Sequence, residues 1–142
     1  MTLDANAGSV HVWPVRVYYE DTDAAGIVYY ANYLKFAERA RTELLRSRDI
    51  DHSRLADEQG LAFAVRDCRI EYHAPARLDD ALEVRTRVLE LSGAAVRIEQ
   101  SVHRDREALA RMEMRIVCVR RDGRPARLPA AVKSAVAPFR AG

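Results

Sequence analysis

Three carboxylates and a hydroxyl stand together at Glu20-Asp21-Thr22-Asp23, and Gly26 follows them closely. A glycine lets the backbone turn sharply because it has no Cβ. Beyond it, from Tyr30 onward, apolar residues recur every three or four positions, which indicates an amphipathic helix. We call residues 20–31 the acidic loop. Because the loop lies just before a helix, its carboxylates are candidates either for capping that helix or for catalysis.

The residues alone leave two roles open for Asp21 and Asp23. Asp is a preferred N-cap residue, so either side chain could satisfy the free N–H groups at the helix start. In the catalytic interpretation, those N–H groups bind a developing oxyanion while a nearby carboxylate attacks a carbonyl or activates water. Gly26 and the apolar pair Ile27-Val28 separate Asp23 from the regular helix, which weakens the capping interpretation for Asp23, and from the residues alone both roles stay open.

The elements that position this loop follow from the apolar pattern. Alternation predicts a strand over residues 11–20, and Pro14 suits its start or a sheet edge. The helix is predicted from Tyr30 to Arg46, with a short helical turn within residues 47–60. Four more strand-like runs follow, at residues 61–73, 82–88, 96–102 and 110–118. In the first of them the apolar phase slips near Arg66-Asp67, as a β-bulge would cause.

Short turns join the later strands, and short connections produce antiparallel neighbours. The predicted fold class is therefore α+β, with one long helix packed on a five-stranded antiparallel sheet. No repeat or linker interrupts the pattern, so residues 1–142 are predicted to form one domain, with a loose tail at 1–10. One helix cannot cover five strands completely, so we expect a second subunit to bury what remains.

Composition excludes several classes of protein. The chain is 49% hydrophobic with 31% charged residues and a net charge of +2, which suits a globular domain and not a nucleic-acid-binding protein. Cys68 and Cys118 lack metal or redox spacing and are predicted to be buried free thiols. The first residues do not resemble a secretory signal, and no run approaches the roughly 20 apolar residues of a membrane span. We expect a cytoplasmic protein.

Other chemistries find little support in the sequence. No G-x-S-x-G motif marks a serine hydrolase, and no glycine-rich loop marks a phosphate site. The four histidines have no mutual spacing typical of metal ligands. We therefore predict neither a metal site nor a resident cofactor.

Four segments resemble the signature of the hotdog-fold acyl-CoA thioesterases, of the 4-hydroxybenzoyl-CoA thioesterase type and the Tol-Pal-associated type. The matching segments are YEDTD at 19–23, AGIVY at 25–29, ERAR at 38–41 and YHAPARLDD at 72–80. The resemblance extends from Trp13 to about Pro138. It implies a hotdog fold and the hydrolysis of a thioester to a free acid and coenzyme A.

The resemblance also implies roles for individual residues. Asp23 matches the family's catalytic carboxylate, as nucleophile or general base, and the backbone N–H of Tyr30 matches its oxyanion donor. Residues at matched positions that we expect near the substrate are Gly26, Val28, Tyr29 and Glu38. A surface ion pair between Glu38 and Arg41, three residues apart on the helix, remains the simpler interpretation of those two charges.

Partners follow from the same resemblance. We expect an acyl-CoA or acyl-carrier-protein substrate, with coenzyme A present only as part of that substrate. The family implies a homodimer or homotetramer whose active sites lie at the dimer interface. A non-catalytic module that binds acyl thioesters or acyl carrier protein is the alternative, and acyl chain length stays open.

Overall fold

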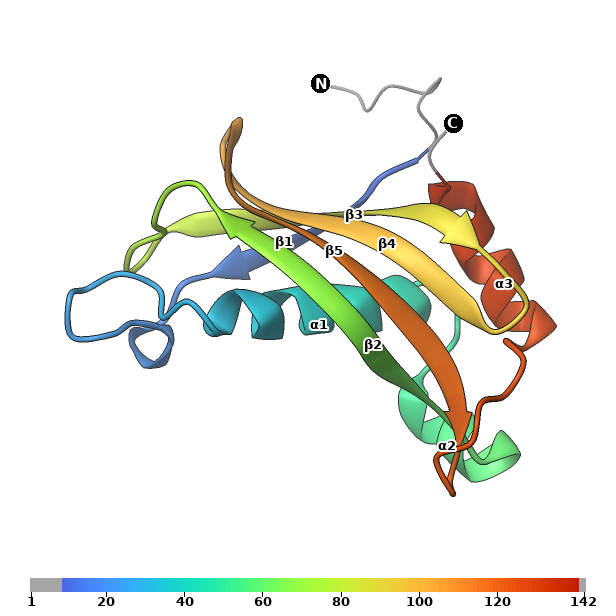
Figure 1. Cartoon of the computed structure of the whole chain (residues 1–142). Coiled ribbons are helices and arrows are strands. Elements are labelled where there is room, and N and C mark those ends of the chain that lie inside the picture. The colour runs from blue at the N-terminus through green and yellow to red at the C-terminus, as the bar shows by residue number, and fades with distance from the viewer. Residues whose placement is uncertain (1–8, 141–142) are drawn as a thin grey trace.

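Five strands form one antiparallel sheet that curves around a long central helix in a computed structural model describing residues 9–140 (Figure 1). The strand order is β1-β3-β4-β5-β2. The strands are β1 His11–Arg16, β2 Leu61–Tyr72, β3 Ala81–Leu91, β4 Ala95–Arg104 and β5 Glu107–Arg120. The helices are α1 Asn32–Arg46, α2 His52–Gln59 and α3 Ala130–Val136, with 3-10 turns at Tyr19–Asp21 and Ala137–Phe139.

The predicted α+β class and the five antiparallel strands are confirmed, but residues 9–140 contain three α-helices and not one. The helical turn expected within residues 47–60 is α2, which begins where Asp51 accepts a hydrogen bond from the Arg54 N–H (2.8 Å) and ends at Gly60 with a φ of 65°. The helix α3 was not predicted because its seven residues give too short a periodic signal. The tail predicted at 1–10 falls mostly on residues 1–8, outside the described residues.

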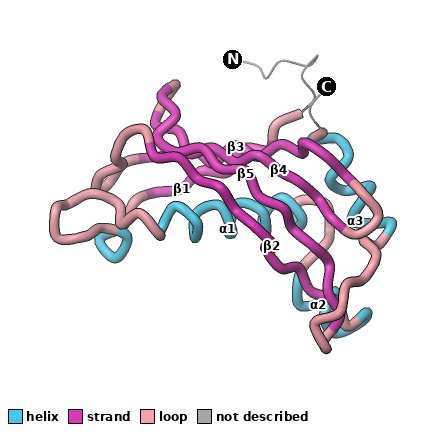
Figure 2. The backbone as a smooth tube through the Cα atoms, in the orientation of Figure 1, coloured by secondary structure: helices cyan, strands magenta, loops and turns pink. Residues whose placement is uncertain are grey.

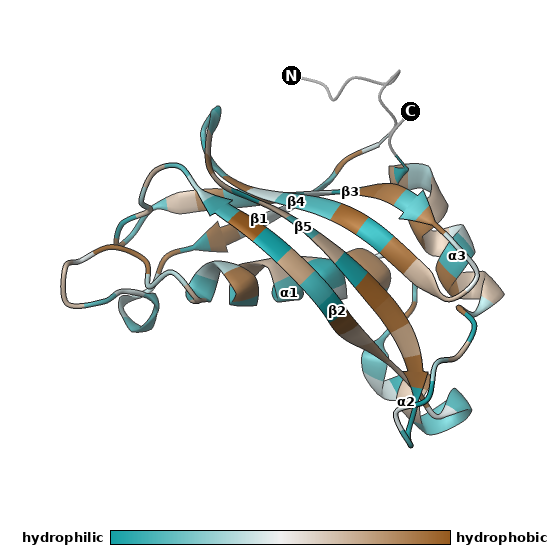
Figure 3. Cartoon of the chain, in the orientation of Figure 1, coloured by the Kyte–Doolittle hydropathy of each residue, from teal (hydrophilic) through white to brown (hydrophobic). Residues whose placement is uncertain are grey.

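The central helix lies along the concave face of the sheet, as Figure 1 shows. Its buried residues recur at helical spacing: Tyr33, Phe36, Ala37, Ala40 and Leu44. The two alanines permit a close approach of α1 to the strands because their side chains are small. Along the strands, hydrophobic and hydrophilic residues alternate (Figure 3). The core therefore lies between α1 and the sheet, with the charged residues of the strands on the other face.

The edge strand β2 differs from the others because most of its residues are exposed on both faces. Its register shifts between Val65 and Asp67, so the predicted bulge is confirmed. The prediction of two buried cysteines holds for Cys118 and is wrong for Cys68, which is exposed. Cys68 pairs directly with Met114 and so shares its face, but α1 packs mainly on β1, β3 and β4, while β2 lies at the far edge of the sheet.

None of the helices within residues 9–140 is long and apolar enough to cross a membrane.

Phe36 tests the packing of α1 on the sheet, since its side chain is fully buried. We expect Phe36→Ala to lower the free energy of unfolding by about 3–5 kcal/mol through lost contacts and a residual cavity. The exposed neighbour Lys35 is the matched control. Lys35→Ala should change the free energy of unfolding by less than about 0.5 kcal/mol. Urea unfolding at one fixed protein concentration measures both. Equal effects of the two substitutions would contradict this packing.

Candidate active site

The acidic loop projects beyond the N-terminal end of α1 as a narrow reversal of the chain (Figure 2). Thr22 and Val28 form an antiparallel bridge, and the Asp23 N–H donates to the Ile27 carbonyl at 2.9 Å. The Gly26 N–H donates a hydrogen bond to the Asp23 carbonyl at 3.0 Å, and the φ of Gly26 is 80°. That positive φ is strained for any residue with a Cβ, so the turn explains the glycine.

Asp23 lies exposed in this reversal, and its carboxylate accepts a hydrogen bond from the Ala25 N–H at 2.8 Å. The start of α1 has no side-chain cap, so neither Asp21 nor Asp23 has the capping role on α1 that the sequence left open. The Asp23 carboxylate therefore keeps one oxygen without a protein donor among the described residues. It is held by a local turn and faces solvent in this single chain.

Asp21, in contrast, is almost fully buried, with 3% of its surface exposed. Its carboxylate accepts hydrogen bonds from the Tyr18 N–H at 2.9 Å and from the Asn32 side-chain amide at 3.0 Å. Its carbonyl accepts from the Tyr29 N–H at 2.9 Å. Buried carboxylates are costly unless such donors surround them. Asp21 thus joins the strand end, the acidic loop and the first residue of α1.

The 72–80 segment supports the loop from the other side. The Val28 N–H donates to the Ala76 carbonyl at 2.8 Å, and the Ala76 N–H donates to the buried Tyr33 hydroxyl at 3.0 Å. Asp80 anchors this segment through the Arg77 N–H and the Arg104 guanidinium, both at 2.8 Å. Although burial raises the pKa of Asp80, these donors outweigh it and leave the pKa lowered.

The backbone N–H of Tyr30 lies at the other end of the loop, just before α1. Within residues 9–140 no oxygen accepts a hydrogen bond from the N–H of Tyr30 or of Ala31. The Tyr30 carbonyl accepts from the Tyr72 hydroxyl at 2.9 Å, which holds the next peptide, the one that carries the Ala31 N–H. An amide that is free at the start of a helix can donate to a negatively charged oxygen.

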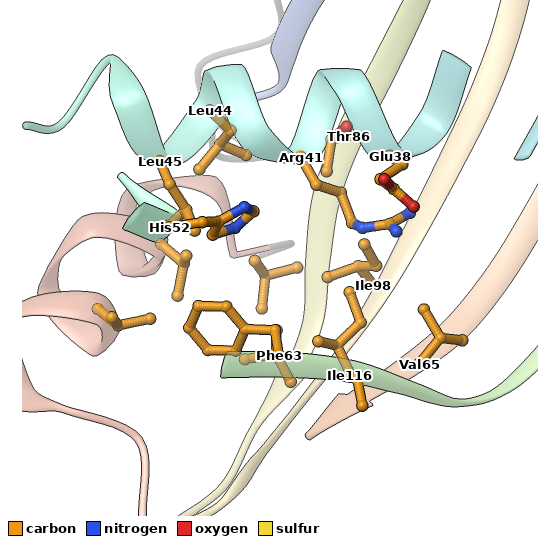
Figure 4. Close-up of a pocket in the computed structure, with 15 residues that line it drawn as sticks. Glu38, Arg41, Leu44, Leu45, His52, Phe63, Val65, Thr86, Ile98 and Ile116 are labelled. Atoms are coloured by element: carbon orange, nitrogen blue, oxygen red, sulfur yellow. The ribbon is translucent and has the colours of Figure 1, made fainter. Parts of the chain in front are cut away.

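The four residues predicted to lie near the substrate do not lie together in the structure. Gly26 forms the reversal and Tyr29 is 45% exposed, whereas the Val28 side chain is buried in the core. Glu38 lies farther along α1 and borders a cavity of about 310 Å³ between the helix and the sheet (Figure 4). Neither Asp23 nor Tyr30 lines that cavity. One chain therefore does not bring all the predicted site residues together.

The cavity itself was not predicted from the sequence. Most of its wall is aliphatic, contributed by α1, α3 and four strands, and Arg41 is its second charged residue beside Glu38. The aliphatic residues are Leu44, Leu45, Val65, Val88, Val96, Ile98, Ile116, Val132 and Val136. The only available signal was the spacing of Glu38 and Arg41 on one helical face, which equally suits a surface pair.

Comparison with known proteins places these features in a family. A sequence model of the thioesterase-like superfamily matches residues 17–136. The acyl-CoA thioesterase YbgC of Haemophilus influenzae is 49% identical over 107 residues, which cover 75% of this chain and 79% of that protein. The acyl-CoA thioester hydrolase YbgC of Escherichia coli is 48% identical over 108 residues, covering 75% and 80%.

Solved structures agree with the sequence relatives. The crystal structure of a probable thioesterase from Bartonella henselae superposes with a TM-score of 0.81 at 36% sequence identity. The match covers 85% of this chain and 100% of that one. The two chains thus share one fold over most of their length.

Asp21 provides a test of how the loop is held. Asp21→Ala leaves the Tyr18 N–H and the buried Asn32 amide without acceptors, and each loss costs about 1–3 kcal/mol. We expect lower stability in urea and faster hydrogen exchange of the backbone amides in residues 20–31. Glu20→Ala, at the exposed neighbour, should change neither. Unaltered exchange in the Asp21 variant would show that the loop is held by other contacts.

Proposed function

Because this chain belongs to the thioesterase-like superfamily and is a thioester hydrolase, we propose that it cleaves acyl-CoA with Asp23 as its catalytic carboxylate. The observation that carries the proposal is the contrast between two neighbouring aspartates. Asp21 is buried and fully bonded, whereas Asp23 is exposed on the loop that Asp21 holds in place. A carboxylate presented on a braced turn is available to react with a ligand.

In the proposed reaction the Tyr30 N–H donates to the thioester carbonyl oxygen and stabilises the negative charge that develops there. Such donors are worth about 10²–10³ in rate. The Asp23 carboxylate either attacks the carbonyl carbon or removes a proton from the attacking water. In both routes the C–S bond breaks, the sulfur leaves as the coenzyme A thiol, and water supplies the oxygen of the free acid.

Acyl-CoA is the substrate class that the printed names of the bacterial relatives support. We extend that class to this chain on the strength of 48–49% identity and of the loop geometry. An acyl-carrier-protein thioester presents the same thioester and pantetheine arm, so it stays within the proposal. We further propose that the enzyme is one cytoplasmic domain without a resident cofactor.

We propose that the working enzyme is a homodimer that completes each site from two chains. Twelve-residue β2 is an edge strand with mostly exposed residues, and long open edges tend to pair with another chain. Large apolar side chains are exposed on the acidic loop, on α1 and along β2: Tyr29, Tyr30, Leu34, Val65 and Tyr72. The rings of Tyr29, Tyr30 and Tyr72 lie against one another, and Val65 borders the cavity. Pairing would cover them and bring a second acidic loop to the cavity.

Asp23→Asn tests the chemistry directly. We expect kcat for thiol release from acyl-CoA to fall by about 10²–10⁴-fold, because the amide can neither attack nor accept the proton. The fold should be unaffected, since Asp23 is exposed and the Asn oxygen can still accept from Ala25. Glu20→Gln, an exposed carboxylate three residues away, is the matched control. Wild-type rates in the Asp23 variant would overturn the assignment.

Val65→Arg tests the dimer. Val65 is 46% exposed in the single chain, so an arginine there is tolerated by the subunit but places a charge in the proposed interface. We expect the wild type to sediment at twice 16.1 kDa or a higher multiple. The variant should shift to 16.1 kDa and lose activity together with the dimer. Ala130→Arg, at an exposed position of α3, controls for added charge, and a fully active wild-type monomer would refute the proposal.

A further inference from the structure

The cavity between α1 and the sheet carries two opposite charges at one end of an otherwise mostly aliphatic wall. Glu38 and Arg41 are its first two residues along α1, and both side chains extend into it in Figure 4. Glu38 and Val65 are exposed at this end, whereas Val88 and Val132 are buried at 1% and 2%. His52 lines the other end, beside Phe63, and is exposed as well. The charged pair therefore borders one opening of the cavity, and the buried valines form its apolar interior.

Arg41 is fixed by neutral partners. Its Nη1 donates to the Gln100 side-chain oxygen at 3.1 Å and to the Met114 sulfur at 3.2 Å. Gln100 is fully buried and is itself locked, because its amide donates to the Ala37 carbonyl and to the Thr86 hydroxyl, both at 3.0 Å. The guanidinium is thus positioned in advance, with Nη1 held by Gln100 and Met114 and the side chain lining the cavity.

The remaining N–H groups of Arg41, on Nε and Nη2, have no acceptor within residues 9–140. Burial lowers the pKa of Arg41, and the nearby Glu38 carboxylate partly opposes that shift. The two side chains nevertheless form no ion pair with each other. A donor-only group and an acceptor-only group therefore border the same entrance.

We propose, on the basis of the proposed thioesterase function, that this pair selects acyl groups with a hydroxyl near the thioester, as in 3-hydroxyacyl-CoA. A hydroxyl can donate to the Glu38 carboxylate and accept from Arg41 at once. A carboxylate substituent would be repelled by Glu38. The apolar interior takes the rest of the acyl chain, so the thioester stays at the opening, where the catalytic groups must reach it.

The same geometry disfavours the obvious alternatives. A plain alkyl chain covers Arg41 without giving it an acceptor. Its binding would remove water from the guanidinium without replacing the hydrogen bonds that the water made. A hydroxyl at the far end of the chain would lie away from Glu38 and Arg41 and could not bond to both. At about 310 Å³ the cavity lies at the low end of the ligand-pocket range of roughly 300–1,000 Å³, which favours a short chain.

The test compares three six-carbon substrates: hexanoyl-CoA, 3-hydroxyhexanoyl-CoA and 6-hydroxyhexanoyl-CoA. We expect kcat/KM for the 3-hydroxy substrate to exceed that for hexanoyl-CoA by about 10- to 100-fold, as for hydrogen bonds to charged groups. The 6-hydroxy substrate should show no such gain over hexanoyl-CoA, because its hydroxyl does not reach both members of the pair. Equal values for the first two substrates, or a preference for the 6-hydroxy substrate, would overturn the proposal.

Two variants assign the preference to this pair. Glu38→Gln and Arg41→Lys should each reduce the ratio of kcat/KM between 3-hydroxyhexanoyl-CoA and hexanoyl-CoA by about 10-fold. A ratio between two substrates is insensitive to loss of folded enzyme, so it stays interpretable if a variant is less stable. Arg39→Lys and Glu58→Gln, exposed residues outside the cavity, should leave the ratio unchanged. An unchanged ratio in both cavity variants would refute their role.

Binding separates this proposal from the proposed function. Calorimetric titration of the Asp23→Asn variant with hexanoyl-CoA and 3-hydroxyhexanoyl-CoA measures selection without turnover. Tighter binding of the hydroxylated substrate supports the cavity assignment even if no acyl-CoA is hydrolysed by the wild type. Equal affinities contradict it even if both substrates are hydrolysed.

Discussion

One helix must cover the concave face of a five-stranded sheet, and it does so only in part. The central helix buries its alanines and Phe36 and packs mainly against β1, β3 and β4, while β2 at the opposite edge stays largely open on both faces. Two features depend on this incomplete coverage. The space that remains between α1 and β2 is the cavity, and the uncovered edge and its apolar neighbours form the surface for a second chain.

The acidic loop shows how a reactive group is positioned by one that is not reactive. Asp21 is enclosed by donors from the strand end and from Asn32, and the 72–80 segment supports the loop through Ala76 and Tyr33. Asp23 contributes only a short local turn. The structural cost of burying a carboxylate and the chemical need for an accessible one are thus divided between two residues.

Local signals made much of this fold predictable. Alternation and helical spacing report on neighbours in sequence, so α1, the strands and the bulge before Asp67 could be inferred from the chain alone. Exposure of Cys68 could not, because it depends on where β2 lies in the sheet. The loop residues could be found from a contiguous motif, whereas the environment of Arg41 is built by Gln100 and Met114, far away in sequence.

The strand order has a consequence for how the chain acquires its structure. Strands β3, β4 and β5 are joined by short connections and neighbour one another, so they can pair early with little loss of loop entropy. Strand β2 pairs only with β5, and its partner residues Leu61 and Arg120 lie far apart in sequence. Strand β2 is thus expected to dock late, and until it does, the edge of β5 stays unpaired and can pair wrongly with another chain.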